Sequence, residues 1–173
     1  MTRKLLVACV SVFLLCTPLL AQTDERRYEV GVKAGVGDYS YTGDVSNTRA
    51  VFGFETCIFC DSRYALFGTY IHLQAPESSG RYRSADLFSI GMRIQGRGMI
   101  SPFFDAGFLA GNNRSREYRY GTRESTATVG LGLGAGVAFR AKKGIYFRPQ
   151  LRMGVMSKSY VAASGEIAIG WRF

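Results

Sequence analysis

The chain has 173 residues and a formal net charge of +9, and it contains 21 glycines, 12 phenylalanines and 10 tyrosines. This length suits one domain with a sizeable core and excludes two domains of comfortable size. In a cytosolic protein the basic balance would suggest a nucleic-acid partner. The N-terminal sequence indicates export instead, and for an exported chain we expect anionic lipid, or a merely solubilising charge, and no nucleic acid.

Residues 1–21 have the pattern of a secretory signal peptide. A basic head at Arg3 and Lys4 precedes an apolar run over 5–15, and a small residue ends the segment. The run is shorter than the ~20 residues that a membrane-spanning helix needs, which makes an N-terminal anchor the weaker interpretation. We therefore predict a cleaved signal peptide over 1–21 and one domain over 22–173.

Eight segments of that domain alternate large apolar side chains with small or charged ones. Since successive side chains of a strand point to opposite faces, this pattern predicts β-strands with one apolar face. The predicted strands cover about residues 28–37, 50–59, 64–73, 88–95, 103–110, 129–140, 145–155 and 167–173. On the third strand we assign Ala65, Phe67, Ile71 and Leu73 to the apolar face and Gly68 to the opposite one.

The connections between these strands alternate in length. The first, third and fifth, at about 38–49, 74–84 and 112–125, are long and polar, whereas the second, fourth and sixth are short. The seventh, at 157–160, breaks the rule because it is brief. If both termini lie in the periplasm, the short turns face the periplasm and the long loops face outside, which is typical of transmembrane barrels. An even number of strands of about ten residues agrees with this.

The second face of the strands separates a membrane barrel from a soluble ligand-carrying barrel, because it mixes repeated glycines with long charged side chains. Its charged members are Glu29, Lys33, Glu55, Arg93, Asp105, Arg140, Arg148, Arg152, Glu166 and Arg172. This mixture suits the narrow interior of eight strands, where glycine makes room for a neighbouring strand's arginine or tyrosine. We expect these charges to pair and fill the lumen, since an isolated buried charge is very unfavourable. Pro149 conflicts with this interpretation, because it removes a ladder donor in mid-strand.

The fold class predicted from the residues is therefore all-β, an eight-stranded antiparallel up-and-down transmembrane β-barrel. The last strand ends on an aromatic residue and resembles the C-terminal signal of Gram-negative outer-membrane β-barrels. Glu166, Trp171 and Phe173 match that signal, while Ala168 stands where glycine is usual. With the signal peptide and the loop asymmetry, the mature chain resembles the small outer-membrane β-barrels of the OmpA and OmpX type.

The resemblance implies a location in the bacterial outer membrane among lipid and lipopolysaccharide. It also implies that the barrel-assembly machinery recognises the C-terminal residues. We expect a monomer with a structural or surface-interaction role, a polar plugged interior and basic extracellular loops. A narrow porin-like channel is an alternative, although diffusion channels normally have more strands.

Two cysteines form a C-x-x-C motif, Cys57 and Cys60, a candidate disulfide in an oxidising compartment. Positions i and i+3 of an extended strand lie ~10 Å apart, beyond the ~7 Å Cα separation that a disulfide allows. A bridge therefore requires Cys60 to curl into the following turn. A redox active site would need a helix start rather than a strand end. The alternating glycines of 130–136 are not followed by a helix that could hold a phosphate at its N-terminus, so we expect no cofactor. We also expect no metal.

His72 is the only histidine of the chain. A lipid A-modifying enzyme would need a serine, a histidine and an acid together at the outer leaflet. The residues beside His72 include no serine, and no matching acid can be singled out from the sequence. We predict a girdle histidine and no catalytic site, with the lipid A-modifying enzyme as the alternative.

Arginines are concentrated in two of the predicted outer loops. They are Arg81, Arg83, Arg114, Arg116, Arg119 and Arg123. Guanidinium groups bind phosphate oxygens bidentately, which makes these six residues candidate contacts for lipopolysaccharide. The alternative is a solvated loop surface without a ligand.

Overall fold

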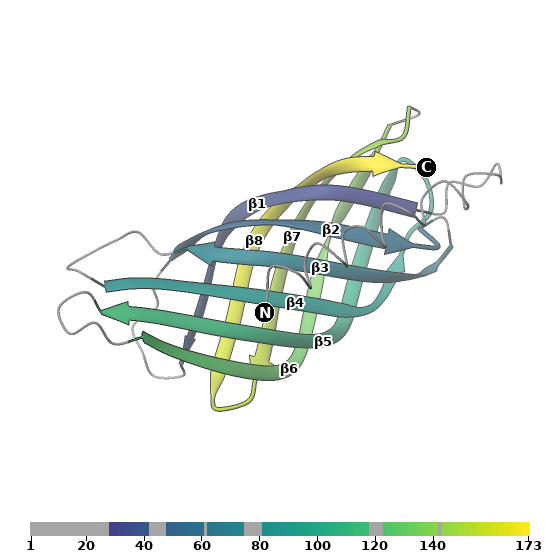
Figure 1. Ribbon diagram of the computed structural model, residues 1–173. Helices are drawn as coiled ribbons and strands as arrows, with labels where there is room; N and C mark the ends of the chain where they lie inside the picture. Colours follow the sequence, from purple (N-terminus) through teal and green to yellow (C-terminus); the bar gives the residue numbers. More distant parts are fainter. Residues whose placement is uncertain (1–27, 42–47, 61, 75–80, 118–122, 142) are drawn as a thin grey trace.

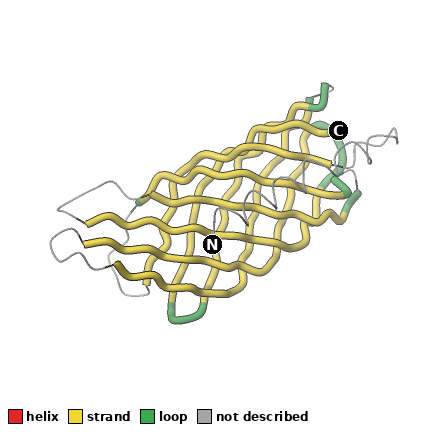
Figure 2. The backbone as a smooth tube through the Cα atoms, viewed as in Figure 1, coloured by secondary structure: helices red, strands yellow, loops and turns green. Residues whose placement is uncertain are grey.

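The computed structural model describes residues 28–41, 48–60, 62–74, 81–117, 123–141 and 143–173. These residues form a wall of strands that curves round and closes on itself (Figure 1, Figure 2). Within this part of the chain no helix is long and apolar enough to cross a membrane. The predicted signal peptide lies outside the described residues and stays a prediction.

The strands are β1 (Tyr28–Tyr41), β2 (Arg49–Ile58), β3 (Tyr64–Gln74), β4 (Arg81–Gln95), β5 (Ile100–Glu117), β6 (Arg123–Arg140), β7 (Ile145–Met156) and β8 (Tyr160–Arg172). Each strand pairs antiparallel with the next, and β8 pairs with β1, so the sheet is a closed barrel. The predicted all-β, eight-stranded, up-and-down architecture is therefore confirmed.

The first and last strands close the barrel along their whole length. Their register runs from Glu29 opposite Arg172 to Tyr41 opposite Tyr160. Beyond that register the backbone N–H of Tyr28 donates to the carbonyl of Phe173, and the N–H of Phe173 donates back, each at 3.0 Å. This pairing is what the predicted barrel requires, and it removes the two sheet edges that an open arrangement would expose.

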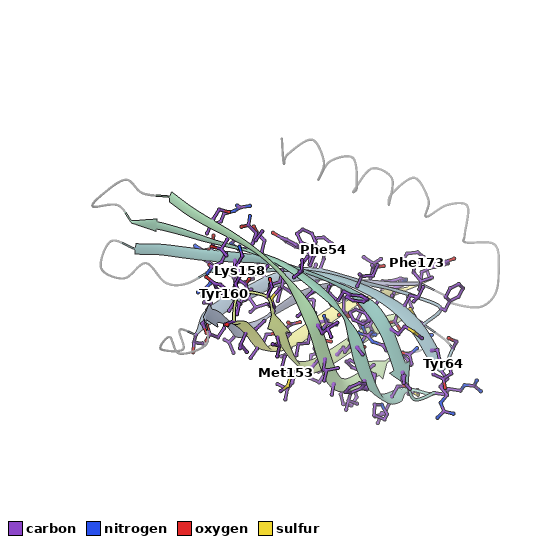
Figure 3. The ribbon with its side chains drawn as sticks, turned by 90° about the horizontal axis from the view of Figure 1, so that it is seen from below. Phe54, Tyr64, Met153, Lys158, Tyr160 and Phe173 are labelled. Carbon is purple, nitrogen blue, oxygen red and sulfur yellow. The ribbon has the colours of Figure 1, made fainter. Side chains whose placement is uncertain are left out.

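The two ends of the barrel differ. The terminal end carries Tyr28, Phe173 and the short turns β2–β3, β4–β5 and β6–β7, whereas the loop end carries the other four connections. Figure 3 shows Phe173 and Tyr64 at the terminal end and Lys158 and Tyr160 at the loop end. The β7–β8 turn at the loop end is brief because Lys158 and Ser159 adopt left-handed φ angles of 59° and 58°, which reverse the chain within three residues.

Several strands extend further toward the loop end than the sequence pattern predicts. β4 begins at Arg81, β5 runs to Glu117 and β6 begins at Arg123, so most of the segment 112–125 is paired backbone rather than loop. Their polar composition resembles that of a loop because these strand ends carry no apolar face. The barrel wall therefore continues beyond its apolar zone.

The outer wall of the barrel is apolar between its two ends. Each strand contributes at least one large exposed apolar side chain, for example Val32, Phe52, Leu66, Ile90, Phe108, Leu131, Met153 and Ile169, in order from β1 to β8. Such a surface would be unfavourable in water at this extent and suits contact with lipid acyl chains.

On β3 the predicted faces are wrong. Phe67, Ile71 and Leu73 are buried inside the barrel, while Leu66 is exposed and Gly68 belongs to the outer face. Alternation was ambiguous here because both faces of β3 carry apolar side chains. The inward set packs against other apolar residues of the lumen, which are described below.

Pro149 lies in the middle of β7, and the ladder beside it is interrupted. The pairs Gly136↔Gln150 and Phe139↔Phe147 flank a two-residue gap in the β6–β7 ladder, and the register is the same on both sides. The β7–β8 ladder continues through Pro149 without a gap. The proline therefore removes pairing locally and on one side only, which reconciles it with a closed barrel.

Glycines supply the space that large inward side chains need, as the sequence predicts. The Tyr146 hydroxyl lies over Gly31 of β1 and Gly170 of β8, where an added Cβ would come within 2.2 and 2.6 Å of it, respectively. This position lets the hydroxyl donate to Glu55 across the lumen at 3.1 Å. A larger residue at either glycine would displace Tyr146 from that contact.

Two glycines of β8 test this packing as a matched pair. A Cβ at position 170 would meet the Val30 carbonyl oxygen at 2.1 Å, whereas a Cβ at position 165 finds its nearest atom at 3.5 Å, on Leu151. We expect Gly170→Ala to lower the free energy of unfolding by about 1–3 kcal/mol, the usual effect of overpacking, and Gly165→Ala to change it little. Urea unfolding of the barrel in lipid vesicles measures both; equal stability of the two variants would contradict this packing.

Candidate functional site

The lumen near the terminal end is occupied by a carboxylate that three arginines share. Glu29 Oε1 lies 3.3 Å from both Arg140 Nε and Arg172 Nε, and its Oε2 accepts from Arg148. Arg140 also donates to Ser101 Oγ at 2.9 Å and to Gln95 Oε1 at 2.7 Å. Charges and hydrogen bonds therefore span this end of the lumen from wall to wall.

A second carboxylate lies further along the lumen. Glu55 accepts from both Arg148 and Tyr146, and Lys33 Nζ lies 3.7 Å from its other oxygen. Lys33 also forms an ion pair with Glu166. Arg148 thus joins Glu29 to Glu55, and Lys33 joins Glu55 to Glu166, so the carboxylates form one continuous network.

The third acidic centre is Asp105 of β5. Arg93 donates to both of its oxygens at 2.7 and 2.9 Å, and Arg152 donates at 2.7 Å. The Arg93 guanidinium lies 4.4 Å from the Phe103 ring centroid, and that of Arg152 lies 4.8 Å from the Phe67 ring centroid. Aromatic faces thus cover cations that have no further carboxylate.

The ten inward charges predicted from the sequence all take part in these ion pairs, which confirms their orientation and pairing. The sequence could not give the partners, because the contacts join strands far apart in the chain. Arg148 and Glu29, for example, are 119 positions apart.

Toward the loop end the lumen becomes apolar, which the sequence reasoning missed. The inward cluster consists of Tyr39, Val51, Ile71, Leu73, Ala85, Leu87, Met156 and Ala162. The Tyr39 and Thr128 hydroxyls form a hydrogen bond across the barrel within it. A cavity of about 30 Å³ remains between this cluster and Asp105, with Asp38, Thr69 and Arg152 among its lining residues. That volume holds at most a few water molecules.

On the outer wall, the apolar zone ends in a polar cluster formed by β3, β4 and β5. Asp86 accepts from Tyr70 Oη and from His72 Nδ1, each at 2.8 Å, and its second oxygen lies 3.1 Å from Arg114 Nη2. His72 and Arg114 are partly exposed, at 30% and 53% of their side chains. We call Tyr70, His72, Asp86 and Arg114 the rim cluster.

The rim cluster lies directly beyond the last outward apolar residues. Phe88 of β4 lies on the same face two positions after Asp86 in the chain, and the centroid of the Phe88 ring lies 4.8 Å from that of Tyr70. Beside it, Ser125 donates to Asn112 at 2.7 Å. No acid could be assigned to His72 from the sequence, because its partner comes from the register of β3 with β4, in which His72 lies opposite Asp86.

The other predicted site residues fall into three groups. Arg81, Arg83, Arg116 and Arg123 belong to paired strand ends beside Arg114, and Arg119 lies outside the described residues. Trp171 and Phe173 are on the outer face at the terminal end, whereas Glu166 points into the lumen. Cys57 ends the buried face of β2, and Cys60 lies in the turn that follows, also buried.

A closed eight-stranded barrel with an apolar outer wall and an ion-paired interior defines a class, the small outer-membrane β-barrel proteins. The chain has the fold of this class, a closed eight-stranded β-barrel with an apolar outer wall. Neither a family model nor a curated protein matches its sequence.

Solved structures share the fold at low sequence identity. Neisserial surface protein A aligns with a TM-score of 0.72 and 10% identity, over 84% of this chain and 97% of that one. Ail, the attachment invasion locus protein of Yersinia pestis, aligns with a TM-score of 0.63 and 15% identity, over 85% and 99%. The N-terminal β-barrel domain of Pseudomonas aeruginosa OprF aligns with a TM-score of 0.58 and 12% identity, over 84% and 97%.

Arg148 tests whether the lumen network holds the barrel together. We expect Arg148→Met to lower the free energy of unfolding by about 3–5 kcal/mol, because it leaves two buried carboxylates without a shared partner. Arg97→Met in the exposed β4–β5 turn is the control and should change stability by less than about 0.5 kcal/mol. The fluorescence of Trp171 during urea unfolding reports both; similar losses from the two variants would refute a structural role for the network.

Proposed function

We propose that this protein is a non-conducting outer-membrane barrel that acts through its loop end, with both termini in the periplasm. One observation carries the proposal. The outer wall changes from apolar to polar between Phe88 and Asp86, where the rim cluster begins. Further arginines follow on the strand ends, the first of them at Arg116, two positions after Arg114. In this orientation the rim cluster lies at the level of the outer-leaflet head groups.

The rim cluster offers cations to an anionic glycolipid such as lipopolysaccharide. Asp86 forms an ion pair with Arg114, and about half of the Arg114 side chain stays exposed. Five further arginines follow in the sequence of the strand ends and their connections. Ail has been crystallised with sucrose octasulfate, a heparin analogue and a polyanion. A barrel of this fold can therefore hold such a ligand, which supports the proposal without extending it to identical residues.

Removal of these arginines should weaken the binding of polyanions. Each cation near an anionic surface contributes about 1 kcal/mol, so Arg114→Gln should lower the affinity for sucrose octasulfate about fivefold. Combining it with Arg81→Gln and Arg83→Gln should multiply the loss. Calorimetric titration of detergent-solubilised protein at low and high salt measures the affinity, and raised salt should weaken wild-type binding.

The matched controls are exposed cations of the terminal end, Arg63→Gln, Arg97→Gln and Lys143→Gln. They carry the same change of net charge but should leave the affinity nearly unchanged. Equal losses from the two triple variants would mean that net charge alone attracts the polyanion, and the rim site would be abandoned.

A lipid A-modifying enzyme is the second candidate, and one contact favours it. His72 Nδ1 lies 2.8 Å from Asp86 Oδ1, the kind of contact by which an acid orients a histidine base. Among the described residues, no serine or threonine hydroxyl bonds to His72, so the arrangement lacks a nucleophile. The lipid A mass profile of cells with wild-type protein and with His72→Asn should be the same; a difference would establish the enzyme in place of the girdle histidine.

The lumen supports a structural role better than a transport role. An ionic network spans the terminal half, and an apolar cluster together with the buried Arg49 and Thr128 occupies the loop half, with a cavity of about 30 Å³ between them. Among the described residues these side chains leave little room for the hydrated path that ions need to cross a pore.

We therefore expect no conductance steps from the wild-type barrel in planar bilayers over the range of voltages that such bilayers tolerate. A large diffusion porin in the same bilayer is the positive control. Discrete openings by the purified barrel would overturn the plug and favour the narrow channel.

The C-terminal strand serves assembly in this proposal. Trp171 and Phe173 present their rings on the outer face at the terminal end, and Phe173 also pairs with Tyr28 to close the barrel. This position suits recognition by the barrel-assembly machinery before closure, since the outer face of the last strand is accessible while its edge is still unpaired.

A further inference from the structure

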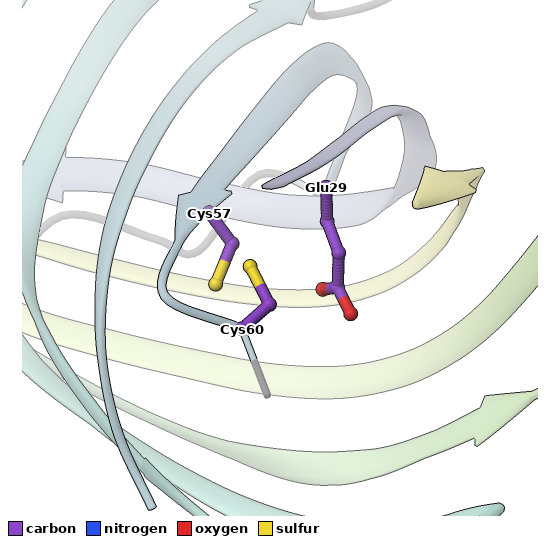
Figure 4. Close-up of side chains that lie close together, drawn as sticks. All are labelled: Glu29, Cys57 and Cys60. Carbon is purple, nitrogen blue, oxygen red and sulfur yellow. The ribbon is translucent and has the colours of Figure 1, made fainter. Parts of the chain in front are cut away.

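The β2–β3 turn is folded back into the terminal mouth of the lumen. Phe59 adopts a left-handed φ of 60°, which reverses the chain directly after β2. This reversal brings Cys60 beneath Cys57, and both side chains are buried, with exposures of 0% and 1%. Figure 4 shows the two sulfur atoms pointing toward one another beside Glu29 of β1. The curl that a bridge requires is therefore present.

The turn is anchored to the lumen network through its backbone. The Cys60 carbonyl accepts from Gln95 Nε2 at 2.5 Å and from Arg140 Nη2 at 3.5 Å, and Gln95 also donates to the Ser62 carbonyl at 3.0 Å. Arg140 in turn pairs with Glu29. These contacts hold Cys60 through its backbone carbonyl and do not involve its sulfur atom.

We propose that Cys57 and Cys60 form a disulfide that locks this turn across the terminal mouth of the lumen. The two Sγ atoms lie within 4.8 Å of one another. Both thiols are free in this structure, and the sulfur atoms have to approach further to reach the ~2.05 Å of a covalent bond. The lock is a modification site, and it is independent of the rim cluster.

The reaction is a thiol–disulfide exchange with a disulfide oxidant of the periplasm. One cysteine thiolate attacks a sulfur of the oxidant's disulfide, which breaks that S–S bond, releases the other sulfur as a thiolate and leaves a mixed disulfide. The second cysteine thiolate then attacks the protein's sulfur in the mixed disulfide, forms the Cys57–Cys60 bond and releases the oxidant's remaining sulfur. Each cysteine loses one proton and one electron, and the oxidant leaves as a dithiol. Because both sulfurs are buried in the closed barrel, exchange must occur before the turn folds into the mouth.

A metal ion is a poorer occupant of the same place. Glu29 and the two sulfurs could together offer three ligand atoms. However, Glu29 already accepts from Arg148 and lies beside Arg140 and Arg172, so a cation would have to displace or face three guanidinium groups. A neutral disulfide makes no such demand on the surrounding charges.

A single tryptic peptide, residues 50–63, contains both cysteines and no internal lysine or arginine. Protein from isolated outer membranes is denatured in the presence of an alkylating reagent, with and without prior reduction. It is then digested with trypsin, and the mass of this peptide is measured by mass spectrometry. Without reduction we expect an unlabelled peptide two hydrogens lighter than the dithiol, and after reduction two labels. Zinc in the undigested protein is measured in parallel.

The variants Cys57→Ser and Cys60→Ser are matched controls, and each should take one label with or without reduction. A heat-dependent gel shift shows that the protein compared is folded. Two labels on folded wild-type protein without reduction would overturn the disulfide, and stoichiometric zinc together with two labels would replace it with a metal site. Since the readout is covalent, it is independent of the conductance and polyanion results.

Discussion

The rest of the structure depends on one constraint, the pairing of every backbone group within a wall that faces lipid. A sheet with free edges would leave N–H and C=O groups unpaired in hydrocarbon, so β1 and β8 must join. The bonds between Tyr28 and Phe173 complete that join at the terminal end. Closing eight strands also fixes a narrow interior, which side chains can just fill. In so narrow an interior the carboxylates of Glu29, Glu55 and Asp105 are buried, and each is therefore paired with a cation within a few ångströms.

The two halves of the lumen satisfy this limit differently. Toward the terminal end arginines reach between strands, and glycines such as Gly31 and Gly170 give large side chains their space. Toward the loop end Leu73 and Leu87 belong to an apolar cluster, and Arg49, Tyr39 and Thr128 are buried in the same half of the lumen. Charged pairs fix which strands lie opposite one another, whereas the apolar cluster only requires volume. The specificity of the interior is therefore concentrated near the end where the chain terminates.

The sequence predicted the strands, their antiparallel order and the closing pair, because a narrow membrane barrel imposes period-two alternation on every strand. It failed on β3, where Phe67, Ile71 and Leu73 point inward and the outward face is also apolar. An alternating pattern does not tell which face points outward when the lumen and the outer wall both accept apolar side chains. It also predicted β4, β5 and β6 shorter than they are, because their arginine-rich ends have the composition of loops. The contact of His72 with Asp86 was beyond reach, because it depends on a cross-strand register that no local pattern encodes.

The chemical difference between the two ends indicates where this barrel can act. At the terminal end the buried Cys60, Gln95 and Glu29 occupy the mouth: Gln95 donates to the Cys60 carbonyl, and Arg140 joins Gln95 to Glu29. At the loop end Arg114 keeps about half of its surface exposed while Asp86 holds its other side. A surface can contact a partner only through groups that are both positioned and accessible. Arg114 is held by Asp86 and is half exposed, whereas the charged groups of the lumen are positioned but buried.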